Sequence, residues 1–87
     1  MSQKHVILGI YLANRLQQAA PVQALLTDYG CNIKTRIGLH EVTGEFCAGY
    51  GLLLLEMIGD LDVTQEFTTK LAAIEGVEVQ RMMFNYP

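Results

Sequence analysis

The apolar residues of this chain are concentrated in two of its four strand-length segments, and this distribution constrains the fold most. Residues 5–12 and 51–58 are apolar at nearly every position, whereas residues 32–40 and 77–84 interleave apolar with polar and charged side chains. A strand covered on both faces needs apolar side chains at successive positions, but a half-exposed strand alternates. The sequence therefore predicts a sheet with the first pair of segments in its centre and the second pair at its edges.

A first helix is predicted between the first two strands. Asn14 followed by Gln17 is a capping-box arrangement, and Gly30 is the expected end. Its apolar stripe comprises Leu16, Ala19, Ala20, Leu25 and Leu26. Pro21 cannot donate a backbone hydrogen bond. Either the helix is kinked there, or its regular part begins nearer to Gln18.

A second helix is predicted between the last two strands. Asp62 and Gln65 are expected to cap its start, and Gly76 lies where a left-handed residue would end it. Apolar residues recur at helical spacing at Val63, Phe67, Leu71 and Ile74.

The resulting order, βαββαβ, predicts an α+β fold of the ferredoxin-like type in a single domain over residues 1–87. Four antiparallel strands would have two helices on one face. That arrangement leaves Ile7, Tyr11 and part of the 52–55 leucine run uncovered. We therefore expect the chain to pack against itself as a homodimer or tetramer, burying Ile7, Tyr11 and Leu53.

Composition narrows the classes of partner. A net charge of -3 with six basic residues argues against direct nucleic-acid binding. No segment approaches the roughly 20 apolar residues that span a bilayer, and the first residues do not resemble a signal peptide. Two cysteines without close spacing form neither a disulfide framework nor a zinc knuckle, so a cytoplasmic location is expected.

The segment 41–50 has no helical or alternating pattern and is expected to be a long hairpin loop with Phe46 at its tip. His40, Glu41 and Cys47 supply an imidazole, a carboxylate and a thiol, which are donors that transition metals prefer. The alternative is structural, with His40 half exposed, Glu41 solvated and Cys47 packed as a small apolar side chain.

Arg36 and Gly38 are the candidate ligand-binding residues of the second strand. A glycine within a strand permits a bulge or the close approach of a ligand. Arg36 could then bind a carboxylate or phosphate, or it could be an ordinary surface arginine or pair with Glu56 across the sheet.

Catalytic chemistry is not expected. The single serine is Ser2, close to the N-terminus, where a nucleophile would be poorly positioned. Asp60 and Asp62 are explained as capping groups at a helix N-terminus. Cys31 is expected to be buried beside the second strand.

The runs 30–41, 51–56 and 71–79 resemble the small stand-alone proteins called iron-only hydrogenase system regulators. The most recognisable points are Arg36-Ile37-Gly38 and Gly76-Val77. The resemblance covers nearly the whole chain. It implies an ACT-like, ferredoxin-like domain that associates through its sheets or edges and regulates by binding small molecules between subunits.

A more distant likeness is to the C-terminal domain of nickel-responsive repressors, which implies tetramers and a nickel site of histidines and one cysteine. Those proteins have a His-x-His pair on the second strand, but Gly38 stands two residues before His40 here. Because the first predicted strand begins at His5, no N-terminal DNA-binding segment is expected.

Together these observations predict a small homo-oligomeric regulatory or ligand-sensing domain. Its effector is expected at a subunit boundary, near Asn14, Arg36, Gly38 and the 41–50 segment. The alternative is a transition-metal-binding protein that uses His40 and Cys47, with Glu41 or a neighbouring subunit completing the site.

Overall fold

The computed structural model describes residues 3–39, 42–43, 46–47 and 49–86. The elements in chain order are β1 Gln3–Leu12, α1 Arg15–Asp28, the 3-10 turn η1 Gly30–Asn32, β2 Ile33–Leu39, β3 Val42–Thr43, β4 Phe46–Cys47, β5 Gly51–Met57, α2 Leu61–Ala72 and β6 Val77–Tyr86. Apart from the short β3 and β4, this is the predicted βαββαβ order.

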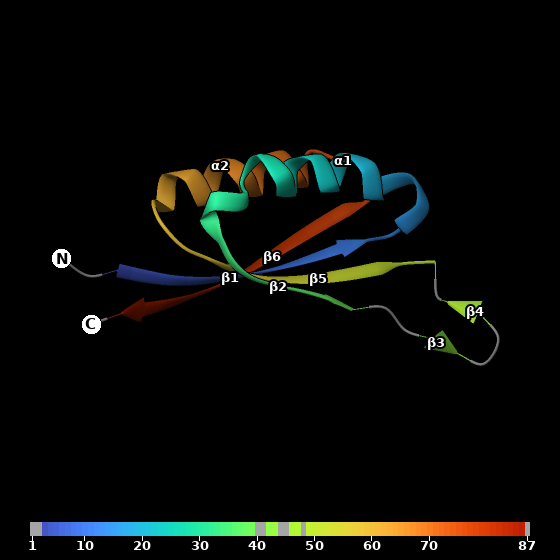
Figure 1. Cartoon of the computed structure of the whole chain (residues 1–87), viewed down its shortest axis with the longest axis horizontal. Coiled ribbons are helices and arrows are strands. Elements are labelled where there is room, and N and C mark those ends of the chain that lie inside the picture. The colour runs from blue at the N-terminus through green and yellow to red at the C-terminus, as the bar shows by residue number, and fades with distance from the viewer. Residues whose placement is uncertain (1–2, 40–41, 44–45, 48, 87) are drawn as a thin grey trace.

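The main sheet has the strand order β2-β5-β1-β6, and all its neighbours are antiparallel. The two apolar strands are central and the two alternating strands are at the edges, so the prediction is confirmed. Figure 1 shows α1 and α2 side by side over one face of this sheet, as in a ferredoxin-like fold. Neither of the described helices is long and apolar enough to cross a membrane.

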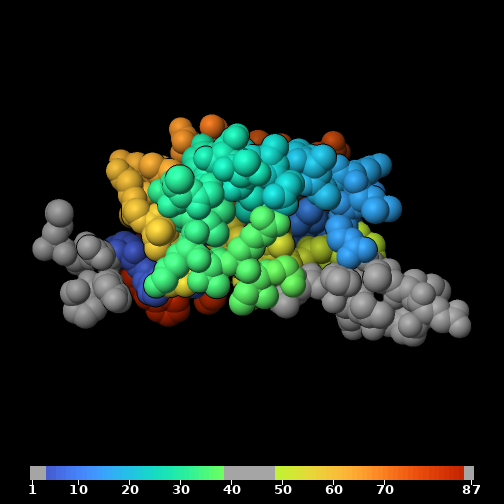
Figure 2. Space-filling model, in the orientation of Figure 1, coloured from blue at the N-terminus to red at the C-terminus, as the bar shows by residue number. Residues whose placement is uncertain are grey.

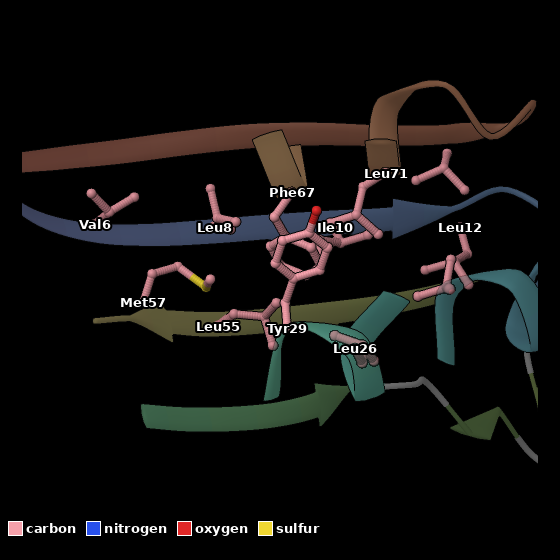
Figure 3. Packing of buried hydrophobic residues seen from close by; sticks show 12 residues of the cluster. Val6, Leu8, Ile10, Leu12, Leu26, Tyr29, Leu55, Met57, Phe67 and Leu71 are labelled. Atoms are coloured by element: carbon pink, nitrogen blue, oxygen red, sulfur yellow. The ribbon is translucent and has the colours of Figure 1, made fainter. Parts of the chain in front are cut away.

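The core lies between this face and the helices. In β1, the buried residues are Val6, Leu8, Ile10 and Leu12, which alternate along the strand and meet Leu55 and Met57 of β5 (Figure 3). Phe67 and Leu71 of α2 cover them and are fully buried, and the Phe67 ring lies 4.8 Å from that of Tyr29. Burial of each large side chain contributes about 1.5–3 kcal/mol, so this layer accounts for much of the stability.

The second helix has the predicted buried face, but both of its ends differ from the prediction. Phe67 and Leu71 are buried, and Val63 and Ile74 pack against the core. The N-cap is Asp60, whose side chain accepts a hydrogen bond from the Asp62 backbone N–H. The predicted cap at Asp62 is therefore wrong by two residues. Gly76 has the expected left-handed conformation, with φ +81°, but the helix ends at Ala72, so Gly76 belongs to the turn before β6 and not to the helix end.

The first helix begins at Arg15 and continues through Pro21, so a start near Gln18 is wrong. Asn14 caps it by accepting from the Gln17 backbone N–H at 3.4 Å. The predicted apolar stripe is confirmed only at its C-terminal end, where Leu26 is buried and Leu25 packs against the core, whereas Leu16 is 88% exposed. The buried face is formed by Gln18, Val22 and Leu26. In Figure 2, α1 forms part of the outer surface of the molecule.

Two local predictions need correction. The 41–50 segment contains the paired strands β3 and β4, with Val42 opposite Cys47 and Thr43 opposite Phe46. Phe46 is therefore in a strand and not at the tip of a loop. Cys31 is exposed rather than buried, because the 3-10 turn η1 places it outside the strand.

Candidate functional site

The sheet face opposite the helices bears a row of large apolar side chains. Directly opposed residues of neighbouring strands share a face, and the register places Ile7 opposite Met82 and Tyr11 opposite Leu52. We call this surface the open face. Its large apolar residues are Ile7, Tyr11, Ile37, Leu52, Leu54, Met82 and Phe84, none of which is buried. Ile37, Met82 and Phe84 are 49%, 54% and 55% exposed.

The open face differs from the predicted one at Leu53. This residue packs against the core, on the helix-covered side of β5. Because side chains alternate along a strand, Leu52 and Leu54 are the ones that point the other way. The prediction that Leu53 joins an interface on the uncovered face is therefore wrong.

A hollow of about 390 Å³ lies in the open face. The residues around it belong to three neighbouring strands and are Gly9, Tyr11, Leu52, Glu78 and Gln80. Gly9 lies between Leu54 of β5 and Gln80 of β6 in the sheet register. Because glycine has no side chain, space is left above the sheet backbone at this position. The Tyr11 ring stacks on Tyr50, with centroids 5.5 Å apart and planes inclined by 26°.

The rim of the hollow is polar on one side. The Gln80 side-chain nitrogen donates a hydrogen bond to the Glu78 carboxylate at 2.8 Å. Ionised carboxylates only accept hydrogen bonds, whereas an amide both donates and accepts. This side therefore offers acceptors at Glu78 and an adjacent amide at Gln80.

A second polar group occupies the opposite end of the open face. His5 Nε2 lies 2.6 Å from Glu56 Oε2, and the Thr35 hydroxyl donates to Glu56 Oε1 at 2.9 Å. Lys34 Nζ is 4.0 Å from the same carboxylate. The hydrogen bonds with His5 and then Thr35 lower the pKa of Glu56 below its usual value, and Lys34 adds to this. The group keeps Glu56 ionised within a largely apolar surface.

Arg36 lies on the helix-covered side and donates a hydrogen bond to Gln23 Oε1 of α1 at 2.9 Å. An irregularity between Ile33 and Thr35 places Thr35 opposite Glu56 and Arg36 opposite Leu55. The alternative that Arg36 pairs with Glu56 is therefore wrong, since the two side chains are on opposite faces of the sheet.

Gly38 lies opposite Leu53, and a Cβ added there would be 3.4 Å from Leu53 Cδ2. A side chain at position 38 would therefore point toward the helix layer, as the Arg36 side chain does. Asn14 is the cap of α1, and its backbone N–H donates to Gln18 Oε1 at 2.8 Å. Ligand binding by Asn14, Arg36 and Gly38 stays a prediction.

The predicted metal ligands cannot be compared with described geometry. His40 and Glu41 lie outside the described residues, and so does the side chain of Cys47, although its backbone belongs to β4. Within the described part of the chain, no group of three or more His, Cys, Asp or Glu residues could hold a metal ion. The metal-binding alternative stays a prediction.

Sequence reasoning missed the hollow, although one signal for it was present. Gly9 interrupts an otherwise apolar central strand, and a glycine in such a place often marks a close approach. Glu78 and Gln80 were recognised only as polar residues of an edge strand. Their position beside Gly9 depends on the β1–β6 register, which a single sequence does not reveal.

Comparison with known proteins gives structural matches only. No family model matches the chain, and no curated protein matches it. An uncharacterised protein of Thermotoga maritima is 25% identical, with a TM-score of 0.79 over 97% of this chain and 99% of that one.

Two further solved structures are more distant. A nitrogen regulatory PII-like protein from Thiomonas intermedia, bound to ADP, AMP and bicarbonate, is 11% identical and has a TM-score of 0.58. The match covers 100% of this chain and 97% of that one. A formyltetrahydrofolate deformylase from Pseudomonas syringae is 18% identical with a TM-score of 0.58, over 93% of this chain but 28% of the enzyme. These likenesses establish the ferredoxin-like fold.

Proposed function

We propose that the chain is a homo-oligomeric regulatory domain that binds a small effector at a boundary between its copies and has no catalytic activity. The observation that supports this most is the open face. Its apolar residues come from all four strands of the main sheet, and exposed apolar patches of this extent usually mark interaction surfaces. A second copy of the chain is the occupant that we propose.

The dimensions of the sheet fit this occupant. Four strands spaced about 4.8 Å apart, two of ten residues and two of seven at about 3.4 Å each, give roughly 550 Å² of flat area. Protruding side chains increase the accessible surface above that value. A stable interface buries about 800 Å² on each partner, so an interface between two copies would use the whole open face.

Known regulators with this fold support a sensing role. The PII-like match is a nitrogen regulatory protein and was solved with nucleotides bound. The sequence resemblance to ACT-like regulators points to the same class. The match extends over 97% of the PII-like chain, which is therefore similar in length to this one. The deformylase match covers only 28% of that enzyme.

Oligomeric state tests the proposal. We expect Ile37→Asp and Met82→Asp to shift the chain toward monomers, since each would place a charge in the apolar interface. Both side chains are about half exposed, so neither substitution should disturb the core. Sedimentation velocity at several protein concentrations measures the change.

Leu16→Asp is the matched control, because Leu16 is 88% exposed on the helix side. It should leave the oligomer unchanged. A native chain that sediments as a monomer, or an oligomer broken by Leu16→Asp but not by the two sheet substitutions, would contradict the proposal.

A further inference from the structure

The hollow around Gly9 extends over both central strands of the main sheet and the edge strand β6. β1 and β5 are the central strands, and the lining residues come from these two and from β6. If a second copy packs over the open face, it covers the hollow and turns it into an enclosed site. The volume of about 390 Å³ is within the range of small-molecule pockets.

The apolar part of the lining fits a flat ring. Gly9 provides a floor without a side chain, Leu52 provides an aliphatic wall, and Tyr11 provides an aromatic wall that is 40% exposed. Tyr50 stacks against Tyr11 and extends the aromatic surface. Aromatic rings bind one another in stacked or edge-on arrangements, so a planar aromatic ligand is favoured over a branched aliphatic one.

The polar part of the lining selects the substituents of that ring. Among the lining residues that the structure describes, Glu78 is the charged one, and its carboxylate accepts hydrogen bonds and repels anions. Gln80 directs its nitrogen to Glu78, which leaves its carbonyl oxygen to accept. The rim is therefore complementary to N–H donors and unfavourable to phosphate or carboxylate groups.

We infer that this hollow is the effector site, and that its ligand is a planar aromatic ring with amino N–H donors and no negative charge. This inference rests on the proposed function, because the second copy supplies the cover. It moves the effector from the predicted position near Asn14 and Arg36 to the opposite face of the sheet.

Two pairs of probes test the chemistry. Tryptamine and indole-3-acetate share a ring but differ in the charge of the side chain, and adenine and hypoxanthine differ by replacement of an amine with a carbonyl. Each is titrated into uniformly 15N-labelled protein, and amide chemical shifts are followed. We expect saturable shifts around Gly9, Tyr11, Leu52, Glu78 and Gln80 with tryptamine and adenine, and binding weaker by about tenfold or more with the other member of each pair.

Gly9→Val is the blocking variant. A Cβ at Gly9 would lie 3.8 Å from Leu54 Cδ2 and 4.0 Å from the Gln80 carbonyl oxygen, which are ordinary contacts. Valine suits a strand, so the fold should persist while the side chain fills the hollow. Glu78→Gln keeps the volume but removes the charge, and should weaken tryptamine binding by about tenfold. Both variants should abolish or reduce the shifts.

Sedimentation velocity on the same samples distinguishes a failure of the assigned effector site from a failure of the proposed oligomer. An oligomer in which no probe gives saturable shifts at millimolar concentration overturns the assigned site and leaves the proposed oligomer intact. Saturable shifts that persist in Gly9→Val, or equal affinities within each pair, also overturn the assignment. A monomer that binds tryptamine at these residues would overturn the proposed oligomer instead.

Discussion

Substitution of Gly76 by alanine should destabilise the fold through two separable effects. Gly76 has φ +81°, and a Cβ there would lie 1.9 Å from Gln18 Nε2. Gln18 is 7% exposed and joins α1 to the turn before β6. Its Oε1 accepts from the Asn14 N–H at 2.8 Å, and its Nε2 donates to the Glu75 carbonyl at 2.7 Å. Gly76→Ala cannot keep this arrangement.

The expected cost is about 2–5 kcal/mol. A left-handed conformation costs a non-glycine residue about 1–2 kcal/mol. Displacement of the Gln18 amide loses two hydrogen bonds, each worth about 0.5–1.5 kcal/mol, in a site where little water can replace them. Urea unfolding followed by circular dichroism, at one fixed protein concentration, measures the change. Gly30→Ala is the control, because its added Cβ meets nothing within 4 Å and its φ is not positive.

A double-mutant cycle tests the mechanism. Gln18→Ala removes the amide that the new Cβ would meet, so Gly76→Ala should then cost only the backbone contribution of about 1–2 kcal/mol. The coupling between the two substitutions should be about 1–3 kcal/mol, the contribution of the two displaced hydrogen bonds. Additive costs would refute the reasoning, because they would show that the Cβ and the Gln18 amide do not compete for space.

Three other predictions follow from the described contacts and the sequence. Asp60→Ala should lower the free energy of unfolding in urea by about 1 kcal/mol, because Asp60 makes the cap hydrogen bond of α2. Asp62→Ala should cost less, and equal costs would contradict the observed cap. The pKa of Glu56 is lowered in the folded state, so its stabilisation is present above its unfolded pKa and is lost as pH falls through the folded value. Thermal melts of Glu56→Gln should therefore differ most from the native chain near neutral pH and converge only as pH falls below the folded pKa, which is lower than the ordinary glutamate value, whereas a constant difference would exclude this linkage. If His40 and Cys47 bind a metal, then nickel, zinc, iron(II) or cobalt should raise the melting temperature of the metal-stripped native protein under reducing conditions. The same metal should not raise the melting temperature of His40→Ala or Cys47→Ser. An equal rise in these variants would exclude the site.

The layer arrangement could be predicted from the sequence because burial on both faces of a strand has a direct compositional signature. The near-continuous apolar residues of β1 and β5 match their central positions, and the alternation in β2 and β6 matches the edges. The stripe of α2 was equally informative, since Phe67 and Leu71 are both buried. These features depend on local periodicity and not on long-range register.

The errors arose where tertiary contacts override local pattern. In α1 a polar residue, Gln18, is buried because its amide bonds to two backbone groups, so a hydrophobic stripe cannot locate the inner face. In β2 the irregularity between Ile33 and Thr35 reverses the faces of the residues that follow. Arg36 therefore contacts Gln23 of α1 instead of Glu56.

The candidate site was less predictable than the fold. Gly9 and Glu78 are 69 positions apart in the chain, and only the pairing of β1 with β6 brings their strands together. Residues 52–55 are all leucine, so the sequence alone does not reveal which of them point to the open face. That depends on the orientation of alternate side chains in β5.

A filtered nuclear Overhauser experiment on a mixture of 13C-labelled and unlabelled protein tests directly whether two copies pair through the open face. Pairing through the open face should give intermolecular signals from the side chains of Ile7, Leu54 and Met82, which lie on that face, and none from Leu16 on the helix side. Intermolecular signals at Leu16 without any at the three sheet residues would contradict it.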